Sequence, residues 1–552
     1  MARWYTVEFV LWYLIILKVY CRKLPDAAAE LAEMCNQDRR CSSYLHHSYF
    51  WPKYPIDLSD IQWREYRKVL PLLSLAAAAH ILARAALGRR RIWPCLMLSG
   101  AFVLYVHGAH TIFVIAACFG SYALAKVCGV SRWAPFVAWA YGLLMIAIKL
   151  SEVRISFGFL GPFGYWLNGL QSHVAWKTSL VSQWNLVGFC GLILWFSKDW
   201  HQSLSLLCLR LISFNMDYYW TLKELKDTKV DDAQAKVTSM PSSLYKTREQ
   251  QSRDLEEYNI TNCLAYCFYS PLWLAGPTTT FNAFTSHIRD RSQEAVVGWK
   301  LLLYATRLLF CFVLLEVMLH SCPVWAIGRS SLYLKVQRPD LLASYAMMML
   351  IAMWLKFLII WRFARLWALC DGIEVVENMQ RCVCNNYCIT SFWRGWHVSF
   401  NRWLVRYLYV PLGGRKYRLV NVWLVFGFVA LWHDAELKLL AWGMLNALFM
   451  VGESLAACVW RSKVFSTVRA LPETSRWVRA AAGASYVYVL FFVNLTGYAL
   501  GVGGTASLAQ HAFLEDWAPC LETLVCTAIF LFAAVQVMLE LRECGLCVDG
   551  AG

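Results

Sequence analysis

The stretch that decides the fold is CVCNNYCITSFWRGWHVSFNRWLVRYLYVPLGGRKYRL (Cys382–Leu419), which is followed by the uncharged run VWLVFGFVALWH (Val422–His433). Within it, eight positions recur at the three- and four-residue spacing of one helix face: Trp393, Trp396, His397, Phe400, Trp403, Leu404, Tyr407 and Leu408. Pro411 and the Gly413–Gly414 pair then end the pattern. The spacing predicts one continuous amphipathic helix, with its aromatic side chains packed inward.

His397 lies within this aromatic face, and Asn401, four residues later, lies on the same side of the predicted helix. An ionisable group inside a membrane-embedded protein is costly to keep there, so it is a functional candidate by default. The alternative is a core histidine that is hydrogen-bonded to a neighbour.

A second histidine, His433, ends the uncharged run and precedes another apolar segment that begins near Leu439. Burial disfavours the charged form of an imidazole, which leaves a neutral ring at pH 7. A neutral imidazole is what a general base requires. The alternative is a helix-end residue that meets lipid headgroups. Asp434 follows directly, but adjacent residues of a helix point about 100° apart, so it is not expected to orient His433.

The distribution of charge also sets this stretch apart from the rest of the chain, because no acidic residue occurs between Glu377 and Asp434. The same interval contains seven basic residues: Arg381, Arg394, Arg402, Arg406, Arg415, Lys416 and Arg418. Without counter-charges they predict a positive field beside a bilayer, suited to the phosphates of coenzyme A or a phosphoinositide. The alternative is the ordinary enrichment of cytosolic loops in lysine and arginine.

Away from this window, composition indicates a membrane protein. Of 552 residues, 59% are hydrophobic and 16% are charged, with a mean hydropathy of +0.43. Soluble proteins average about 45–50% apolar and about 25% charged residues. The composition therefore excludes a disordered, collagenous or ordinary soluble chain. The net charge is +16, but the basic residues lie beside membrane-length segments, so we expect no nucleic-acid partner.

The apolar runs predict an all-α, polytopic membrane protein with about 10–12 membrane helices. Val7–Tyr20 is expected to be a retained first span, and Asn185–Ser197 another. Shorter runs suit re-entrant segments, which occur only where protein covers their backbone, so we expect an enclosed tunnel. We divide the chain into N-terminal membrane helices with an interfacial segment (1–210) and a core with C-terminal helices (211–552), together one continuous membrane domain.

The 21 cysteines are dispersed through apolar runs, unlike the framework of a small secreted disulfide-rich protein. Most are therefore predicted to be small buried hydrophobes. Cys382, Cys384 and Cys388 lack a histidine at zinc spacing, so no structural zinc is expected.

Two runs, FWRGWHVSFNRWLVRYLYVPLGG (Phe392–Gly414) and FVALWHD (Phe428–Asp434), resemble the membrane-bound O-acyltransferase family. The match is to the branch of the glycerol-uptake-protein homologues and, more distantly, Hedgehog acyltransferase. Three further stretches agree with this branch: RLISFNMDYYW (Arg210–Trp220), YSPLWLAGPTTTFNAF (Tyr269–Phe284) and QRCVC (Gln380–Cys384).

The resemblance implies a ring of helices around a transverse tunnel, which acyl-CoA enters from the cytosol and the acceptor from the lumen or membrane. It implies that His433 is the catalytic histidine and that His397 occupies the second catalytic position. Cys382 matches a cysteine that ligates haem in Hedgehog acyltransferase; the alternative is a buried or palmitoylated thiol. The expected substrate-binding residues are Asn401, Arg402, Arg406, Trp396, Trp432 and Lys416.

The function implied is acyl transfer from acyl-CoA to a lipid hydroxyl in the endoplasmic reticulum membrane. The expected acceptor is a lysophospholipid, above all the sn-2 hydroxyl of a lyso-GPI (glycosylphosphatidylinositol) during anchor remodelling. Hedgehog acyltransferases have aspartate where this chain has His397, and this difference favours a lipid over a protein acceptor. Two alternatives remain: a Hedgehog-type protein palmitoyltransferase, and a glycerol or polyol transporter.

Overall fold

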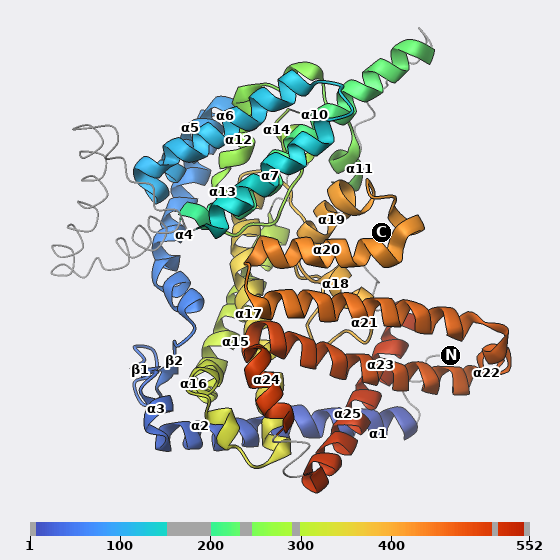
Figure 1. The fold of residues 1–552 in the computed structure, drawn as a ribbon. Helices are drawn as coiled ribbons and strands as arrows, with labels where there is room; N and C mark the ends of the chain where they lie inside the picture. The colour runs from blue at the N-terminus through green and yellow to red at the C-terminus, as the bar shows by residue number, and fades with distance from the viewer. Residues whose placement is uncertain (1–6, 152–199, 232–244, 290–297, 511–516, 546–552) are drawn as a thin grey trace.

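The structure, a computed structural model, describes residues 7–151, 200–231, 245–289, 298–510 and 517–545 (Figure 1). Over these residues the chain is helical apart from a small antiparallel pair of strands, β1 (Leu45–His46) and β2 (Ile56–Asp57). The predicted all-α class is confirmed. The predicted segment Asn185–Ser197 lies outside the described residues.

The helices follow one another in three groups. The N-terminal group is α1 (Val7–Lys18), α2 (Leu24–Gln37), α3 (Arg39–Ser42), α4 (Ile61–Leu87), α5 (Ile92–His107), α6 (Thr111–Cys128) and α7 (Ala134–Leu150). The middle group is α10 (Trp200–Asp231), α11 (Tyr245–Gln250), α12 (Ile260–Phe268), α13 (Ser270–Trp273), α14 (Phe281–Arg289), α15 (Trp299–Ser321), α16 (Val324–Ser330) and α17 (Pro339–Cys370). The last group is α18 (Ile389–Gly395), α19 (Val398–Leu404), α20 (Arg418–His433), α21 (Leu437–Arg461), α22 (Ser466–Ala470), α23 (Pro472–Asn494), α24 (Gly501–Gln510) and α25 (Trp517–Glu543).

Seven helical segments in the described part of the chain are long and apolar enough to cross a membrane: α4, α6, α15, α17, α21, α23 with its extension to Ala499, and α25. Two shorter apolar helices, α5 and α7, accompany them. The predicted 10–12 spans refer to the whole chain and include shorter runs. Among the predicted spans, α1 has only 12 residues before a π-helical turn. Helix α20 has 16 residues and belongs to the short segments expected to be re-entrant.

The helices pack around two main hydrophobic cores. One core is built around α5, α6, α7, α10 and α12, and the other around α2, α15, α16 and α17 (Figure 1). Helices α20, α21 and α23 lie between them in Figure 1, with α20 packed along α21. A fully buried ion pair joins α4 to the end of α17, since Arg84 Nε lies 3.1 Å from Asp371 Oδ1. The Tyr269 hydroxyl donates to the other carboxylate oxygen at 2.9 Å.

The predicted continuous helix from Trp393 to Leu408 is wrong. The structure has α18, then a turn at His397, then α19, which continues into a π-helical turn at Val405–Tyr409. His397 has φ +46° and ψ +52°, in the left-handed region, and a helix cannot pass through such a residue. The aromatic residues of the predicted face are instead distributed over two short helices and the turn between them.

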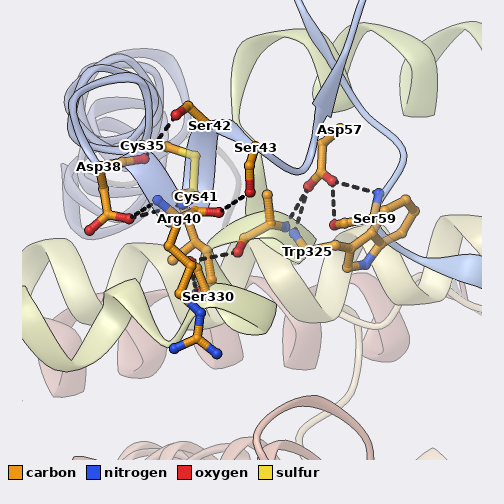
Figure 2. The surroundings of a disulfide bond; sticks show 12 residues. Cys35, Asp38, Arg40, Cys41, Ser42, Ser43, Asp57, Ser59, Trp325 and Ser330 are labelled. Atoms are coloured by element: carbon orange, nitrogen blue, oxygen red, sulfur yellow. Dashed lines mark hydrogen bonds between the residues drawn. A yellow bond between two sulfur atoms is a disulfide. The ribbon is translucent and has the colours of Figure 1, made fainter.

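The N-terminal segment 28–67 is organised by a disulfide that the sequence analysis did not predict. Cys35 at the end of α2 is bonded to Cys41 in α3, and Asp38 between them accepts hydrogen bonds from the backbone N–H groups of Arg40 and Cys41 (Figure 2). The remaining 17 cysteines of the described residues are free, and eight of them are buried, which is fewer than the predicted majority. The sequence did not single out Cys35 and Cys41 from the 21 cysteines, because the two sulfurs meet only through the turn of the chain between α2 and α3.

Replacing both Cys35 and Cys41 by serine is expected to lower the free energy of unfolding by about 2 kcal/mol, because the bond restricts the unfolded chain even across a short loop. Thermal unfolding of the detergent-solubilised protein measures the change. The matched control is Cys458→Ser, which removes an exposed free thiol and should leave the melting temperature unchanged. A double variant that melts with the wild type would contradict the bond.

Candidate active site

Both histidines singled out by the sequence line one cavity of about 1770 Å³. Its walls come from the start of α4 and from α16 to α21, with a further contribution from Tyr498 and Ala499. A pocket for one drug-sized ligand has about 300–1,000 Å³. The cavity therefore has room for two substrates at once, as a transfer reaction requires.

One face of α20 forms a continuous wall of this cavity. The residues on it are Arg418, Val422, Val425, Phe426, Val429, Trp432 and His433. At about 1.5 Å rise per residue, the first and last lie about 22 Å apart along the helix. The wall therefore begins with a cation, continues as an apolar surface and ends at an imidazole.

His433 is held at the last residue of α20 by contacts from several helices. Its ring centroid lies 4.8 Å from that of Trp432, 6.0 Å from Tyr498 and 6.3 Å from Trp442. Lys149 at the end of α7 donates to the backbone carbonyls of Trp432 (3.2 Å) and His433. A cation at the C-terminal end of a helix is favourable because the last carbonyls carry partial negative charge. Lys149 thus fixes the segment that presents the histidine.

His397 is held by its backbone and by ring stacking. Among the described residues, only Ser331 shares its positive φ without being glycine. Such a conformation costs about 1–2 kcal/mol, and it persists where the surrounding structure demands it, often at functional sites. The imidazole stacks on Trp361 of α17, with ring centroids 4.4 Å apart and planes 15° apart. The turn at His397 points the ring into the cavity.

Both imidazoles lie close to one indole, that of Trp432. The Trp432 centroid is 6.4 Å from His397 and 4.8 Å from His433. No hydrogen bond joins either imidazole to another of the residues that the structure describes. Within these residues, neither histidine has the hydrogen-bonded neighbour that the core alternative requires. Both residues line the cavity.

Three of the predicted substrate-binding residues, Asn401, Trp396 and Trp432, also line the cavity. The Asn401 side chain donates to the backbone carbonyl of Trp393 at 2.7 Å. That bond fixes its amide at the cavity wall near His397, whose carbonyl accepts from the Asn401 backbone N–H.

The structure places Arg402, Arg406 and Lys416 outside the cavity lining. Arg402 pairs with Glu249 of α11, and Arg406 with the buried Asp217 of α10, each at 2.8 Å. Burial raises the pKa of Glu249 to about 7, and the Arg402 guanidinium opposes that rise. The expectation that the basic residues lack counter-charges is therefore wrong for these two, because distant segments supply the carboxylates. Lys416 lies over the ring of Tyr417, 5.2 Å from its centroid.

Other cations line the cavity instead. Arg415 and Arg418 flank Lys416, and Arg394 and Arg461 line it as well. Arg394, Arg415 and Arg418 belong to the seven basic residues noted in the sequence, but no role was predicted for them. Arg461 and Lys149 were not predicted to belong to the site. A lysine at the end of an apolar run is a signal that could have identified Lys149, whereas nothing in the sequence marks the partners of His397.

The residues around Cys382 do not fit a haem. A haem needs a porphyrin-sized space beside the ligating sulfur, and the cavity is lined by Val383 but not by Cys382. A hydrogen bond with Cys384 lowers the pKa of the Cys382 thiol to about 7. Across the described ranges, no group of three or more His, Cys, Asp or Glu side chains is placed to hold a metal ion.

Comparison with known proteins agrees with this geometry. Residues 187–501 match the model of the family described as "MBOAT, membrane-bound O-acyltransferase family", and the match includes both histidines. The chain is 31% identical to "Membrane-bound O-acyltransferase gup1" of Schizosaccharomyces pombe, over 97% of this chain and 88% of that protein. It is 30% identical to "Membrane-bound O-acyltransferase GUP1" of Saccharomyces cerevisiae, over 98% of this chain and 92% of that protein.

A more distant relative is "Protein-cysteine N-palmitoyltransferase HHAT" of Mus musculus, 25% identical over 50% of this chain and 56% of that protein. The family match covers more than half of the chain, and the two yeast relatives align with nearly all of it. The chain therefore belongs to the membrane-bound O-acyltransferase family and is an acyltransferase of its GUP1 and HHAT branch.

Proposed function

We propose that this enzyme transfers a fatty acyl group from acyl-CoA to a lipid hydroxyl, with the sn-2 hydroxyl of a lyso-GPI as acceptor. The observation that carries the proposal is the arrangement along α20, where cations at one end and two imidazoles at the other flank an apolar wall of the same cavity. A thioester donor has this order of parts, since its phosphates, its long pantetheine arm and its fatty acyl group follow one another.

His433 is the general base in this proposal. Its neutral ring takes the proton of the acceptor hydroxyl, the oxygen attacks the thioester carbonyl, and an oxyanion forms. The C–S bond then breaks, and the departing thiolate takes the proton from His433. The products are an ester and free coenzyme A, so protons and electrons balance.

His397 and Asn401 are assigned to the acceptor and to the oxyanion. Both line the cavity, and the His397 ring lies 6.4 Å from that of Trp432, which neighbours His433. Preorganised donors help most where charge develops in the transition state, because they need not reorient at that moment. The left-handed turn at His397 and the bond from Asn401 to Trp393 provide such preorganisation.

We assign the enzyme to the endoplasmic reticulum membrane. The Cys35–Cys41 disulfide supports this, since such bonds persist in oxidising compartments such as its lumen. The membrane itself is supported by the seven apolar helices of the described residues.

The decisive assay uses the purified protein in liposomes with labelled palmitoyl-CoA. Ester formation on lyso-GPI is the expected result, whereas amide formation on a secreted peptide with an N-terminal cysteine would support the HHAT-like alternative. In cells, loss of the enzyme should cause lyso-GPI to accumulate, as measured by lipid mass spectrometry. Uptake of labelled glycerol into liposomes that survives His433→Ala would support the transporter alternative.

Replacing both Arg415 and Arg418 by glutamine is expected to raise the KM for acyl-CoA about tenfold or more. Hydrogen bonds to charged groups contribute about 1.5–3 kcal/mol each, and both residues line the cavity. The measurement is initial rate against acyl-CoA concentration at saturating acceptor. Lys416→Gln is the control that separates the two assignments. The sequence pattern predicts that Lys416 binds phosphate, but Lys416 does not line the cavity. A KM that rises as much in Lys416→Gln as in the double variant would contradict the assignment from the cavity.

A further inference from the structure

A second polar group lines the same cavity, on the side formed by the start of α4 and by α16. Its members are Ser59, Asp60, Gln62, Arg329 and Lys356. Lys356 Nζ lies 2.8 Å from Asp60 Oδ2, and Arg329 Nη1 donates to the Ser59 carbonyl at 2.8 Å. The sequence analysis singled out none of these residues, and the mechanism above uses none of them.

The charges of this group do not balance. Asp60 Oδ1 already caps α4 by accepting from the Trp63 backbone N–H at 2.7 Å, and its other oxygen accepts from Lys356. Arg329 forms an ion pair with none of the carboxylates in the described ranges. Two cations therefore line the cavity with one lining carboxylate, Asp60, whose two oxygens are both engaged. The neighbouring Asp57 is buried and accepts from Ser59 and from the backbone at the start of α16. Arg329 is thus the cation at this wall that has no carboxylate partner among the described residues.

Aromatic side chains surround these donors. Lys356 Nζ lies 5.0 Å from the ring centroid of Phe357 and 5.8 Å from that of Trp325. Five residues beyond Lys356 on α17 is Trp361, which stacks on His397. At about 1.5 Å per residue, this is a rise of about 8 Å along the helix. Lys356 thus lies on the same helix as the indole that stacks on His397, less than two turns from it.

The fold holds this group rigidly. Asp57 accepts from the backbone N–H groups of Trp325 and Ala326 at 2.8 and 3.0 Å, so it joins β2 to the start of α16 (Figure 2). The same carboxylate accepts from the Ser59 hydroxyl at 2.6 Å. The disulfide between Cys35 and Cys41 lies beside these contacts in Figure 2. The disulfide also assigns this side of the molecule to an oxidising compartment.

We infer that Arg329 and Lys356 bind the phosphate of the acceptor's headgroup, so that the acceptor is an anionic lysoglycerolipid. This inference rests on the proposed function. A planar guanidinium and an ammonium are the groups that proteins use for phosphate. The donor's phosphates are assigned to Arg415 and Arg418, at the far end of α20 from His433. A neutral monoacylglycerol offers the same hydroxyl without a phosphate and is the natural comparison.

The test compares two acceptors at saturating palmitoyl-CoA, lysophosphatidylinositol and monoacylglycerol. Arg329→Gln is expected to raise the KM for lysophosphatidylinositol about tenfold and to leave the KM for monoacylglycerol and for palmitoyl-CoA within twofold. Glutamine can still donate to the Ser59 carbonyl, and no carboxylate loses its partner. The matched control is Arg338→Gln, an arginine outside the cavity that pairs with Glu30 and Asp340; it should leave all three KM values unchanged.

Lys356 needs a paired variant, because its loss alone would leave Asp60 without a partner. Asp60→Asn with Lys356→Met removes both charges and is expected to raise the KM for lysophosphatidylinositol further in the Arg329→Gln background. Equal losses with the two acceptors, or a rise confined to palmitoyl-CoA, would overturn the inference. Inorganic phosphate is expected to compete weakly, because it shares only the headgroup's phosphate. Inhibition by phosphate as tight as the binding of lysophosphatidylinositol would also overturn the inference, since it would identify a site for free phosphate and not for a lipid.

The inference and the proposed function can fail separately. If the wild type acylates neither these acceptors nor lyso-GPI, the proposed function fails, and binding then tests the inference alone. Tryptophan fluorescence, to which Trp325 and Trp361 contribute, is expected to titrate with lysophosphatidylinositol micelles in the wild type and about tenfold more weakly in Arg329→Gln. Equal titrations would overturn the headgroup site whatever the reaction.

Discussion

His433→Ala is expected to lower acyl transfer by about 10²–10⁴-fold, which is the range that a general base contributes. The proton of the acceptor hydroxyl would then have no acceptor at the end of α20, where the ring of His433 lines the cavity. The measurement is single-turnover ester formation in liposomes, so that product release does not hide the chemical step. His433→Gln tests the same role, because its amide can hydrogen-bond but cannot carry the proton.

The fold should survive this change, because His433 is held mainly by its backbone and by surrounding aromatic rings. Expression and melting temperature are therefore expected to stay near those of the wild type. A matched control is His320→Ala, which removes a part-buried histidine that bonds Ser48 outside the cavity. Turnover by His433→Ala at more than a tenth of the wild-type rate would remove His433 from the reaction.

Three substitutions at His397 are expected to distinguish the catalytic role of its imidazole from the effect of its backbone conformation on stability. His397→Gly should lose about 10²-fold or more in kcat, yet gain about 1 kcal/mol in stability, because glycine adopts φ +46° without strain. His397→Asn should keep part of the activity, since asparagine tolerates this conformation and still offers a hydrogen-bond donor. His397→Ala should lose activity without gaining stability.

The order of these variants carries the test. Activity should fall from wild type to asparagine to glycine, while melting temperature should be highest for glycine. If glycine were fully active, His397 would be a turn residue only. If glycine were destabilised, the Trp361 stacking contact would outweigh the backbone strain, and activity would have to be compared at matched stability.

Sequence patterns identified much of the helical structure because periodicity records which face of a helix is buried. They placed His397, Asn401 and Trp432 in one functional region, and the structure gathers these at one cavity. Periodicity could not reveal the break between α18 and α19, since side chains on two short helices can share the spacing of one. The break consists of two non-helical residues, the extended Trp396 and the left-handed His397.

Charge counting along the chain was less reliable. Seven cations without a nearby acid suggested a phosphate site, but Arg402 and Arg406 are paired with Glu249 and Asp217 from segments more than 150 residues away. Ion pairs depend on distances in space, and a linear count sees only neighbours in the chain. For the same reason the polar group of Asp60, Arg329 and Lys356 could not be recognised as one site, because its members are more than 290 residues apart at the extremes.

The sequence by itself determined the membrane class, the family and the two histidines, because composition, helical spacing and a long aromatic motif are properties of the chain. Only the tertiary structure decided which cations face the cavity, how His397 turns toward it, and that Lys149 and Trp361 hold the two imidazoles in place. These depend on contacts between helices that are far apart in sequence, and packing rather than local preference sets such contacts.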